Sequence, residues 1–227
     1  MTRTAFDRLD PRIPIVAVDV AIFTVLEGGL KILLVKVKKP PYAGLWALPG
    51  GIIRSDESLN QAAYRELAEK TGVKNVYLEQ LYTFGDVTRD RTRRAISTVY
   101  FALLTATGLN LTTTPKYAGI EWFSADRLPP LAYDHARVIR YGVQRLCWKL
   151  EYTNVAWSLL PETFTLTDLQ NVYEAILGKK LDRRNFRKKI LSLPLLASTG
   201  KRRRAGAHRP AVLYRFPRRR PMIVKIL

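Results

Sequence analysis

The stretch GGIIRSDESLNQAAYRELAEKTGV, residues 50–73, constrains the fold more than any other part of this 227-residue chain. Its two glycines allow a sharp backbone turn, and the pattern that follows predicts a helix over Leu59–Lys70. Arg65, Glu66 and Glu69 are three or four residues apart on that helix, so their side chains lie near one edge. Carboxylates at this spacing can bind Mg²⁺ through oxygen, and the ion would polarise a diphosphate for attack by water. An isolated motif of this kind is more often an ordinary surface helix with salt bridges.

The position that would supply a third acid is occupied by a lysine. Lys70 follows Glu66 by four residues, so we expect an ion pair between them worth about 0.3–0.5 kcal/mol. A cation at this position repels Mg²⁺ and also occupies one of the acids. The sequence therefore predicts that no metal or other cofactor is bound and that nucleoside diphosphate compounds are hydrolysed very slowly or not at all.

The first 150 residues alternate strand and helix patterns. Two β-branched runs in Ile15–Val37 flank Glu27-Gly28-Gly29 and predict a hairpin. Further strand-like runs precede a helix around His135–Glu151, and Ser55 or Asp56 is expected to order the start of the first helix. Strands mixed with two helices predict an α/β or α+β domain over residues 1–150.

Residues 151–227 have a different pattern and are predicted to form a second domain. The segment TFTLTDLQNVYEAILGK predicts a helix that is capped by Thr167 or Asp168 and stopped by Gly178. A second helix, LDRRNFRKKILSL, is expected next, followed by two short strands around a long basic loop. Its inward-facing residues are expected to be Leu181, Phe186, Ile190 and Leu193. Helix, turn, basic helix and basic hairpin is the order of a winged helix-turn-helix module.

Charge is distributed unevenly between these two parts. The formal net charge is +19, of which residues 151–227 carry +12. Solubility alone does not require such segregation, so a polyanionic partner is favoured, with nucleic acid first and an anionic membrane second. The only cysteine, Cys147, excludes an intramolecular disulfide. No run of about 18 apolar residues exists, so no segment is expected to span a membrane. The single cysteine fits a reducing compartment and the N-terminus has no secretory pattern, so we predict a cytoplasmic protein without a membrane partner.

The basic helix and hairpin supply candidate DNA contacts. Arginine can pair bidentately with guanine and asparagine with adenine, and lysines and hairpin residues can contact phosphates. The alternative for Asn185 is a polar residue local to its helix. The predicted DNA contacts are Arg183, Arg184, Asn185, Arg187, Lys188, Lys201, Arg202, Arg203, Arg204, His208 and Arg209.

The segment Thr83–Ser97 supplies candidate ligand contacts, because four arginines there lie close to two aspartates in sequence. Arginine suits phosphate and ribose-phosphate recognition through its forked donors. An exposed basic loop is an equally good interpretation on charge alone. The predicted ligand contacts are Arg54, Glu66, Glu69, Arg89 and Asp90.

The spacing of the first motif resembles the Nudix box. The matching residues are Gly51, Glu57, Arg65, Glu66, Leu67, Glu69, Gly72 and Val73, and the single departure from the box is Lys70. The resemblance implies a Nudix α/β/α sandwich over roughly residues 12–150. It also implies that Glu57, Arg65, Glu66, Glu69 and Lys70 form a degenerate box without catalytic residues.

Taken over nearly its whole length, the chain resembles the NrtR-type Nudix-related transcriptional regulators of NAD metabolism. Residues 181–187, LDRRNFR, look like that family's recognition helix. The resemblance implies a homodimer that binds palindromic operator DNA and represses genes of NAD synthesis or salvage at the nucleoid. It also implies a pocket for ADP-ribose or a related metabolite. Two alternatives are an active Nudix hydrolase with a basic nucleic-acid-binding tail and a non-catalytic RNA-binding module.

Overall fold

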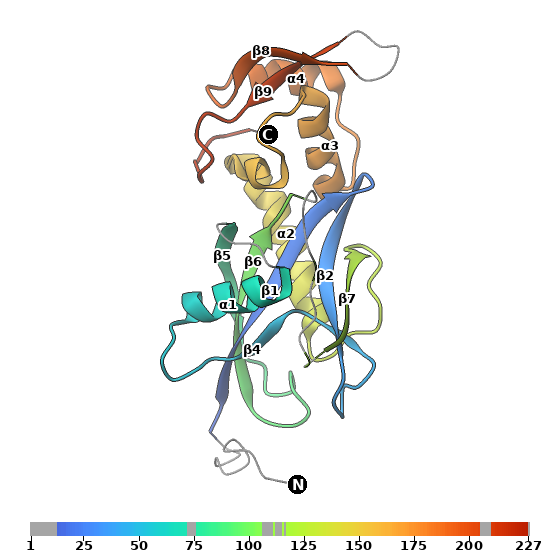
Figure 1. Ribbon diagram of the computed structural model, residues 1–227, viewed down its shortest axis with the longest axis vertical. Helices are drawn as coiled ribbons and strands as arrows, with labels where there is room; N and C mark the ends of the chain where they lie inside the picture. The colour runs from blue at the N-terminus through green and yellow to red at the C-terminus, as the bar shows by residue number, and fades with distance from the viewer. Residues whose placement is uncertain are drawn as a thin grey trace.

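A mixed seven-stranded sheet forms the centre of the N-terminal domain (Figure 1). The computed structural model describes residues 13–71, 76–105, 111, 115, 117–204 and 210–226. The main strand order is β3-β2-β1-β6-β5, with β4 paired to β1 and β7 paired to β2. The β1–β6 pair is parallel and the other pairs are antiparallel. The strands are β1 (Ile15–Leu26), β2 (Gly29–Val37), β3 (Trp46–Ala47), β4 (Gly50–Ile52), β5 (Tyr77–Phe84), β6 (Ala95–Leu103) and β7 (Tyr117–Ser124).

The β1–β2 connection is the hairpin that the sequence predicts. Its two turn residues, Glu27 and Gly28, have φ angles of 53° and 74°. Positive φ at both central residues is typical of a tight type I′ hairpin turn, which glycine favours. The turn therefore fixes the pairing of β1 with β2, two strands that carry much of the buried core.

Two helices cover opposite faces of the sheet. Helix α1 (Leu59–Thr71) packs Ala62, Ala63 and Leu67 against one face of β1, and α2 (His135–Tyr152) packs against the other face. The expected α/β/α sandwich is confirmed. Ser58, not Ser55 or Asp56, orders the start of α1, because it immediately precedes the first helical residue. Its Oγ accepts a hydrogen bond from the Gln61 amide at 3.2 Å, and Gln61 Oε1 accepts the Ser58 amide at 2.8 Å.

The C-terminal domain has the order predicted for a winged helix. It contains the short 3₁₀ helix η2 (Val155–Leu159), α3 (Leu166–Leu177), α4 (Arg183–Leu191), β8 (Ala197–Arg203) and β9 (Ala211–Arg215). A β-bridge between Phe164 and Tyr214 adds a third short segment beside β9.

The two ends of α3 have clear physical causes. Thr165, not Thr167 or Asp168, is the N-cap, because α3 begins at Leu166. The Thr165 hydroxyl accepts the amide of Asp168, and the Asp168 carboxylate accepts the amide of Thr165, which together form a capping box. Gly178 ends the helix with a φ of 65°, as the sequence predicts.

One hydrophobic core joins the two domains. Phe164, Tyr173 and Phe186 of the winged helix belong to the same buried cluster as Leu146 and Leu150 of α2. Helix α2 therefore packs on the sheet of one domain and on the core of the other (Figure 1). The boundary predicted at residue 150 falls in the last turn of this helix.

Candidate functional site

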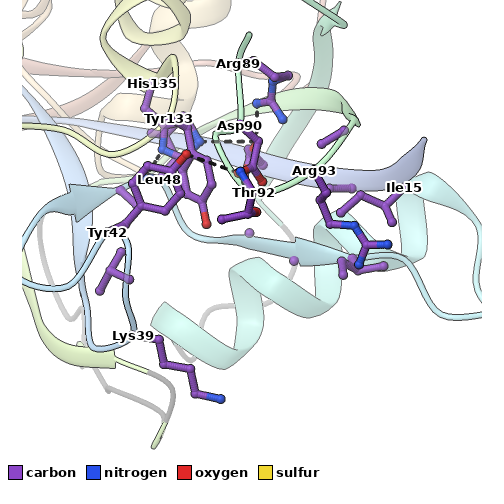
Figure 2. A pocket seen from close by; sticks show the side chains of 18 of the residues that line it. Ile15, Lys39, Tyr42, Leu48, Arg89, Asp90, Thr92, Arg93, Tyr133 and His135 are labelled. Carbon is purple, nitrogen blue, oxygen red and sulfur yellow. Dashed lines mark hydrogen bonds and ion pairs between the residues drawn. The ribbon is translucent and has the colours of Figure 1, made fainter. Parts of the chain in front are cut away.

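A cavity of about 350 Å³ opens where β1, the β3–β4 turn and the loop after β5 meet the start of α2 (Figure 2). Its volume lies within the range of small-molecule sites, about 300–1,000 Å³. The polar and aromatic residues that line it are Asp19, Lys39, Tyr42, Arg89, Asp90, Thr92, Arg93, Tyr117, Tyr133 and His135.

Aromatic rings form one wall of the cavity. The ring centroids of Tyr42 and Tyr133 are 4.2 Å apart, and those of Tyr133 and His135 are 5.0 Å apart. Tyr133 has a φ of 55°, in the left-handed region that non-glycine residues rarely adopt. Burial, reinforced by the negative charge of Asp90, raises the pKa of Tyr133 to about 12, so its hydroxyl keeps its proton. Such a wall can stack on a planar ring and donate a hydrogen bond.

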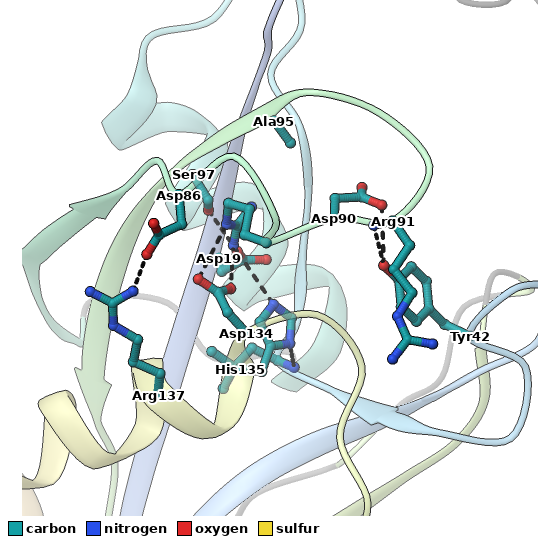
Figure 3. A network of polar contacts seen from close by, with 12 residues as sticks. Asp19, Tyr42, Asp86, Asp90, Arg91, Ala95, Ser97, Asp134, His135 and Arg137 are labelled. Atoms are coloured by element: carbon teal, nitrogen blue, oxygen red, sulfur yellow. Dashed lines mark hydrogen bonds and ion pairs between the residues drawn. The ribbon is translucent and has the colours of Figure 1, made fainter.

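A buried polar network lies behind this wall (Figure 3). At its centre, the Asp19 carboxylate accepts the Ser97 hydroxyl at 2.6 Å and an Arg89 N–H at 3.4 Å. His135 Nε2 lies 3.5 Å from the same carboxylate. Burial alone would raise the pKa of Asp19, but His135, Arg89 and Ser97 outweigh it and lower that pKa to about 2.

The first residue of α2 ties this network to the β3–β4 turn. His135 Nδ1 accepts a hydrogen bond from the Leu48 amide at 2.9 Å. Because Nδ1 faces the Leu48 amide, Nε2 is the ring nitrogen that faces the Asp19 carboxylate. The start of α2 is therefore fixed against the cavity by directional contacts.

Arg89 and Asp90, which were predicted as ligand contacts, both line the cavity and both have protein partners. The Arg89 guanidinium donates to Asp134 at 3.0 Å in addition to Asp19. Asp90 accepts the Tyr42 hydroxyl at 3.2 Å and the amide of Thr92 at 2.8 Å. Both residues hold the loop after β5 in place beside the cavity, and Arg89 does so by contacting Asp134, the N-cap residue of α2.

The degenerate box forms a chain of charges along α1. Arg65 donates to both oxygens of Glu57 and, at 2.6 Å, to Glu66. Hydrogen bonds from Arg65 lower the pKa of Glu57 to about 2. The Lys70 Nζ lies 3.7 Å from Glu66 Oε2 and 3.4 Å from Glu69 Oε2, and the Lys70 side chain is only 1% exposed. The predicted pair of Lys70 with Glu66 is confirmed.

Lys70 also touches the wall of the cavity through an aromatic ring. Its Nζ lies 5.1 Å from the centroid of Tyr117, whose hydroxyl donates to the Gly50 carbonyl at 3.1 Å. Of the predicted ligand contacts, Arg54, Glu66 and Glu69 do not line the cavity. They lie on or beside α1, and their charges are directed at one another and at Arg65 and Lys70.

The sequence did not single out Tyr42, Tyr133, His135 or Asp19 as site residues. Three of them belong to no recognisable motif, because chain segments far apart in sequence bring them together. Asp19 did carry a signal, because it is the only charged residue in the apolar run of β1 and acids are rarely buried without a partner.

A second candidate surface is formed by α4 and the β8–β9 hairpin. Phe186 and Ile190 are buried, and Arg183, Arg184, Asn185 and Lys188 are exposed. Arg184 and Lys188 are one turn apart and lie opposite the buried pair in helical spacing. Their helix therefore presents a basic face to solvent, which a recognition helix requires.

Arg187 is less available for DNA contact than the sequence suggests. It is half-buried and donates to the Thr167 hydroxyl of α3 at 3.1 Å. Burial and the neighbouring Arg183 lower its pKa. Its guanidinium packs against the start of α3, so it holds the two helices together as well as adding positive charge.

The basic hairpin departs from the prediction. Lys201, Arg202 and Arg203 were placed in a loop, but they belong to β8, because pairing with β9 resumes after a bulge and continues to Arg203. Arg203 donates to both oxygens of Asp168, at 2.7 and 2.8 Å, and so pairs with the start of α3. Arg204 is exposed, and His208 and Arg209 lie outside the described residues.

Two family models match the two halves of this architecture. The Nudix domain model matches residues 16–142, and the NrtR DNA-binding winged helix domain model matches residues 156–216. The fold and its sites thus define a Nudix domain joined to a DNA-binding winged helix domain. Among the described residues, α2 and the shorter helices all lack the length and apolarity needed to cross a bilayer.

Similar proteins narrow this class to one family. The chain is 37% identical to the ADPR responsive transcriptional repressor NtrR of Acinetobacter baylyi, over 93% of this chain and 85% of that one. Shewanella oneidensis NrtR in complex with a 27mer DNA shares 37% identity and a TM-score of 0.79, over 88% and 93% of the two chains. The NUDIX domain of the same protein in complex with ADP ribose shares 37% identity and a TM-score of 0.54, over 64% and 99%. The chain belongs to the NrtR family of Nudix-related transcriptional regulators.

Proposed function

We propose that this chain represses transcription by binding operator DNA through its winged helix and that ADP-ribose, bound in the cavity, weakens this binding. The relatives support both partners, since one is a repressor responsive to ADPR and others are seen with DNA and with ADP ribose. The active species would be a homodimer bound to a palindromic site at the nucleoid. Half-sites would then lie about one helical turn, roughly 34–36 Å, apart.

The chemistry of the cavity suits a dinucleotide-like ligand. The rings of Tyr42 and Tyr133 can stack on a base. Arg93 and Lys39 line the cavity away from the buried network and can meet a diphosphate (Figure 2). The loop that carries Arg93 also carries Arg89, so ligand contacts there would be felt at the start of α2.

We further propose that the Nudix domain does not hydrolyse its ligand. A catalytic Mg²⁺ needs free carboxylate oxygens, but Glu66 and Glu69 both face the ammonium of Lys70, and Glu66 also accepts from Arg65. The residues present therefore do not fit a divalent ion at the position the Nudix box would use. The buried cation supplies the positive charge that an ion would otherwise bring.

The proposed ligand response rests on the position of α2. Its first residue, His135, lines the cavity, and its last turns pack in the core shared with the winged helix. A ligand that moves the start of this helix changes the placement of the DNA-binding domain. The ligand can alter DNA affinity only to the extent that it prefers one of these arrangements.

The test is a binding titration beside a turnover assay. A duplex selected by the wild-type protein from a random pool is titrated with and without saturating ADP-ribose, and ADP-ribose hydrolysis is followed with Mg²⁺ or Mn²⁺. We expect operator affinity to fall roughly 5- to 150-fold, the usual range of allosteric coupling, without hydrolysis. Equal affinities in the two titrations would refute the sensing role. Rapid turnover would favour the hydrolase alternative, and a preference for RNA over duplex DNA would favour the RNA-binding one.

A further inference from the structure

Residues 217–226, here called the strap, follow the segment matched by the winged helix family model and run back to the end of α2. Val224 donates its amide to the Tyr152 carbonyl at 2.8 Å, and Ile226 donates its amide to the Glu151 carbonyl at 2.7 Å. These carbonyls lie in the last turn of α2, where helix carbonyls have no partner within the helix. The strap therefore completes the backbone hydrogen bonding of α2 at the end nearest the winged helix.

Side chains anchor the strap to the same region. Asn154, which is 1% exposed, donates to the Arg220 carbonyl at 3.1 Å and accepts the Met222 amide at 2.8 Å. Arg219 donates to the carbonyls of Trp157 at 2.7 Å and Leu160 at 2.7 Å. The basic run that includes Arg219 is thus partly a structural anchor on η2 rather than a free charged surface.

The far end of the strap reaches the recognition helix. Ile226 is 1% exposed and lines an apolar groove together with Phe186 and Ile190, the buried face of α4. The same buried face of α4 is also held by α3, where the ring centroids of Tyr173 and Phe186 lie 5.2 Å apart. The groove has a volume of about 360 Å³.

We propose that Ile226 is a positioning residue through which the strap links the end of α2 to the recognition helix α4. Movement of α2 would then pull the strap through its backbone hydrogen bonds and reorient α4 through Ile226. This inference rests on the proposed function, because it concerns how the ligand signal reaches DNA. It adds a second connection between the domains beside the core that α2 shares with the winged helix.

The experiment compares two isoleucines three residues apart in the strap. Ile226→Ala and Ile226→Asp remove the contact with α4, whereas Ile223, which is 88% exposed, provides the matched controls Ile223→Ala and Ile223→Asp. Ile226→Val is the conservative variant. Each full-length protein is tested for thermal unfolding, for ADP-ribose affinity by calorimetry and for affinity for the selected duplex with and without ADP-ribose.

The readout is the dissociation constant for the duplex with ADP-ribose divided by the constant without it. We expect a wild-type ratio of roughly 5 or more and a ratio close to 1 for Ile226→Ala, with unchanged ADP-ribose affinity. Ile226→Val and both Ile223 variants should keep the wild-type ratio. A purely structural role would weaken DNA binding equally in both titrations and leave the ratio unchanged.

The outcomes separate the two proposals. A folded Ile226→Ala protein with the wild-type ratio would overturn the role of the strap while leaving the repressor function intact. A wild-type ratio of 1 would overturn the proposed function, and with it any signal for the strap to carry. If Ile226→Asp unfolds, the milder Ile226→Ala and Ile226→Val pair still decides the question.

Discussion

Replacing Lys70 by glutamate tests whether a buried cation stands where a Nudix domain would hold its metal. The Lys70 Nζ lies 3.7 Å from Glu66 and 3.4 Å from Glu69, and its side chain is 1% exposed. At an effective dielectric constant near 20, each contact corresponds to about 4–5 kcal/mol of Coulomb attraction before the cost of burying the charges. Removing one partner of a buried pair typically costs about 3–5 kcal/mol of the free energy of unfolding.

Two substitutions separate the effect of the Lys70 charge from the effect of its side-chain volume. Lys70→Met keeps much of the side-chain volume and leaves Glu66 with Arg65 alone, so we expect a loss of about 3 kcal/mol that Mg²⁺ does not restore. Lys70→Glu adds a third carboxylate and is expected to be less stable without metal. That variant restores the carboxylate set of the box, so divalent ions should stabilise it.

The assay is thermal unfolding in EDTA and in 10 mM MgCl₂. At a metal concentration of 100 times the dissociation constant, the stabilisation is about 2.7 kcal/mol. For a chain of this size that corresponds to a rise in Tm of roughly 5–10 °C. We expect this rise in Lys70→Glu and no rise in the wild type. Lys149→Glu, which reverses another buried lysine that pairs with Glu79 at 2.9 Å, is the control and should not respond.

Two results would refute the reasoning. If Mg²⁺ raised the Tm of the wild type as much as that of Lys70→Glu, the lysine would not exclude the ion. If Lys70→Glu were insensitive to Mg²⁺ and Mn²⁺ while folded, the geometry of α1 and the glycine turn would no longer suit a metal, whatever the charge at position 70.

Other substitutions test the cavity and the DNA surface. Asp19 has a pKa of about 2, below its ordinary 3.8, so its contribution to the free energy of unfolding is present above pH 4 and is lost as the pH falls toward 2. Urea unfolding should show a loss of about 2 kcal/mol over this pH range in the wild type and a smaller loss in Asp19→Asn. A Cβ at Gly50 would collide with the Asp19 carboxylate and the Val18 carbonyl, so Gly50→Ala should abolish calorimetric ADP-ribose binding while leaving the winged helix able to bind DNA. Arg184→Ala should weaken binding to the selected duplex by roughly 5- to 150-fold and relax the sequence preference. Arg202→Ala should weaken binding to selected and unrelated duplexes alike and reduce the salt slope by about 1. If both variants weakened binding only to the selected duplex, and by equal factors, the two arginines would not differ in this way.

The sequence predicted the box helix and the charge pairing on it because both depend on local spacing. Residues three and four apart on a helix are neighbours whatever surrounds them, so the contact of Lys70 with Glu66 followed from the order of residues alone. The longer strands β1, β2, β5 and β6 and the two C-terminal helices were predicted for the same reason, since each carries its own periodicity. The short strands β3 and β4 were not predicted, because they lie in a segment rich in proline and glycine.

The cavity could not be predicted in this way because its walls are not local. The ring centroids of Tyr42 and Tyr133 lie 4.2 Å apart, although the two residues are far apart in the chain. Their approach depends on the sheet order and on the point at which α2 begins. Glu66 and Glu69 of α1, which the sequence placed at the ligand, do not line the cavity and pair with Arg65 and Lys70.

The basic hairpin was misread for a different reason. A run of like charges normally indicates an unpaired loop, but β8 and β9 form a two-stranded sheet whose basic residues stay exposed, so cations are tolerated within the strand. Gly200, with a φ of 73°, provides the bulge after which pairing resumes. Backbone hydrogen bonding, which the side-chain pattern does not report, decided the structure of this segment.

A receptor and an enzyme make opposite demands on one pocket. A sensor that cleaved its ligand would lower the concentration it measures, and its DNA affinity would then follow the rate of turnover. Lys70 pairs with both Glu66 and Glu69 while α1 stays packed on the sheet, so no metal ion is needed to balance the two carboxylates. The Lys70 Nζ also lies 5.1 Å from the ring centroid of Tyr117, which lines the cavity and donates to the Gly50 carbonyl, so the same lysine supports the wall of the binding site. Both the proposed absence of hydrolysis and the retention of the pocket can therefore be tested at a single side chain.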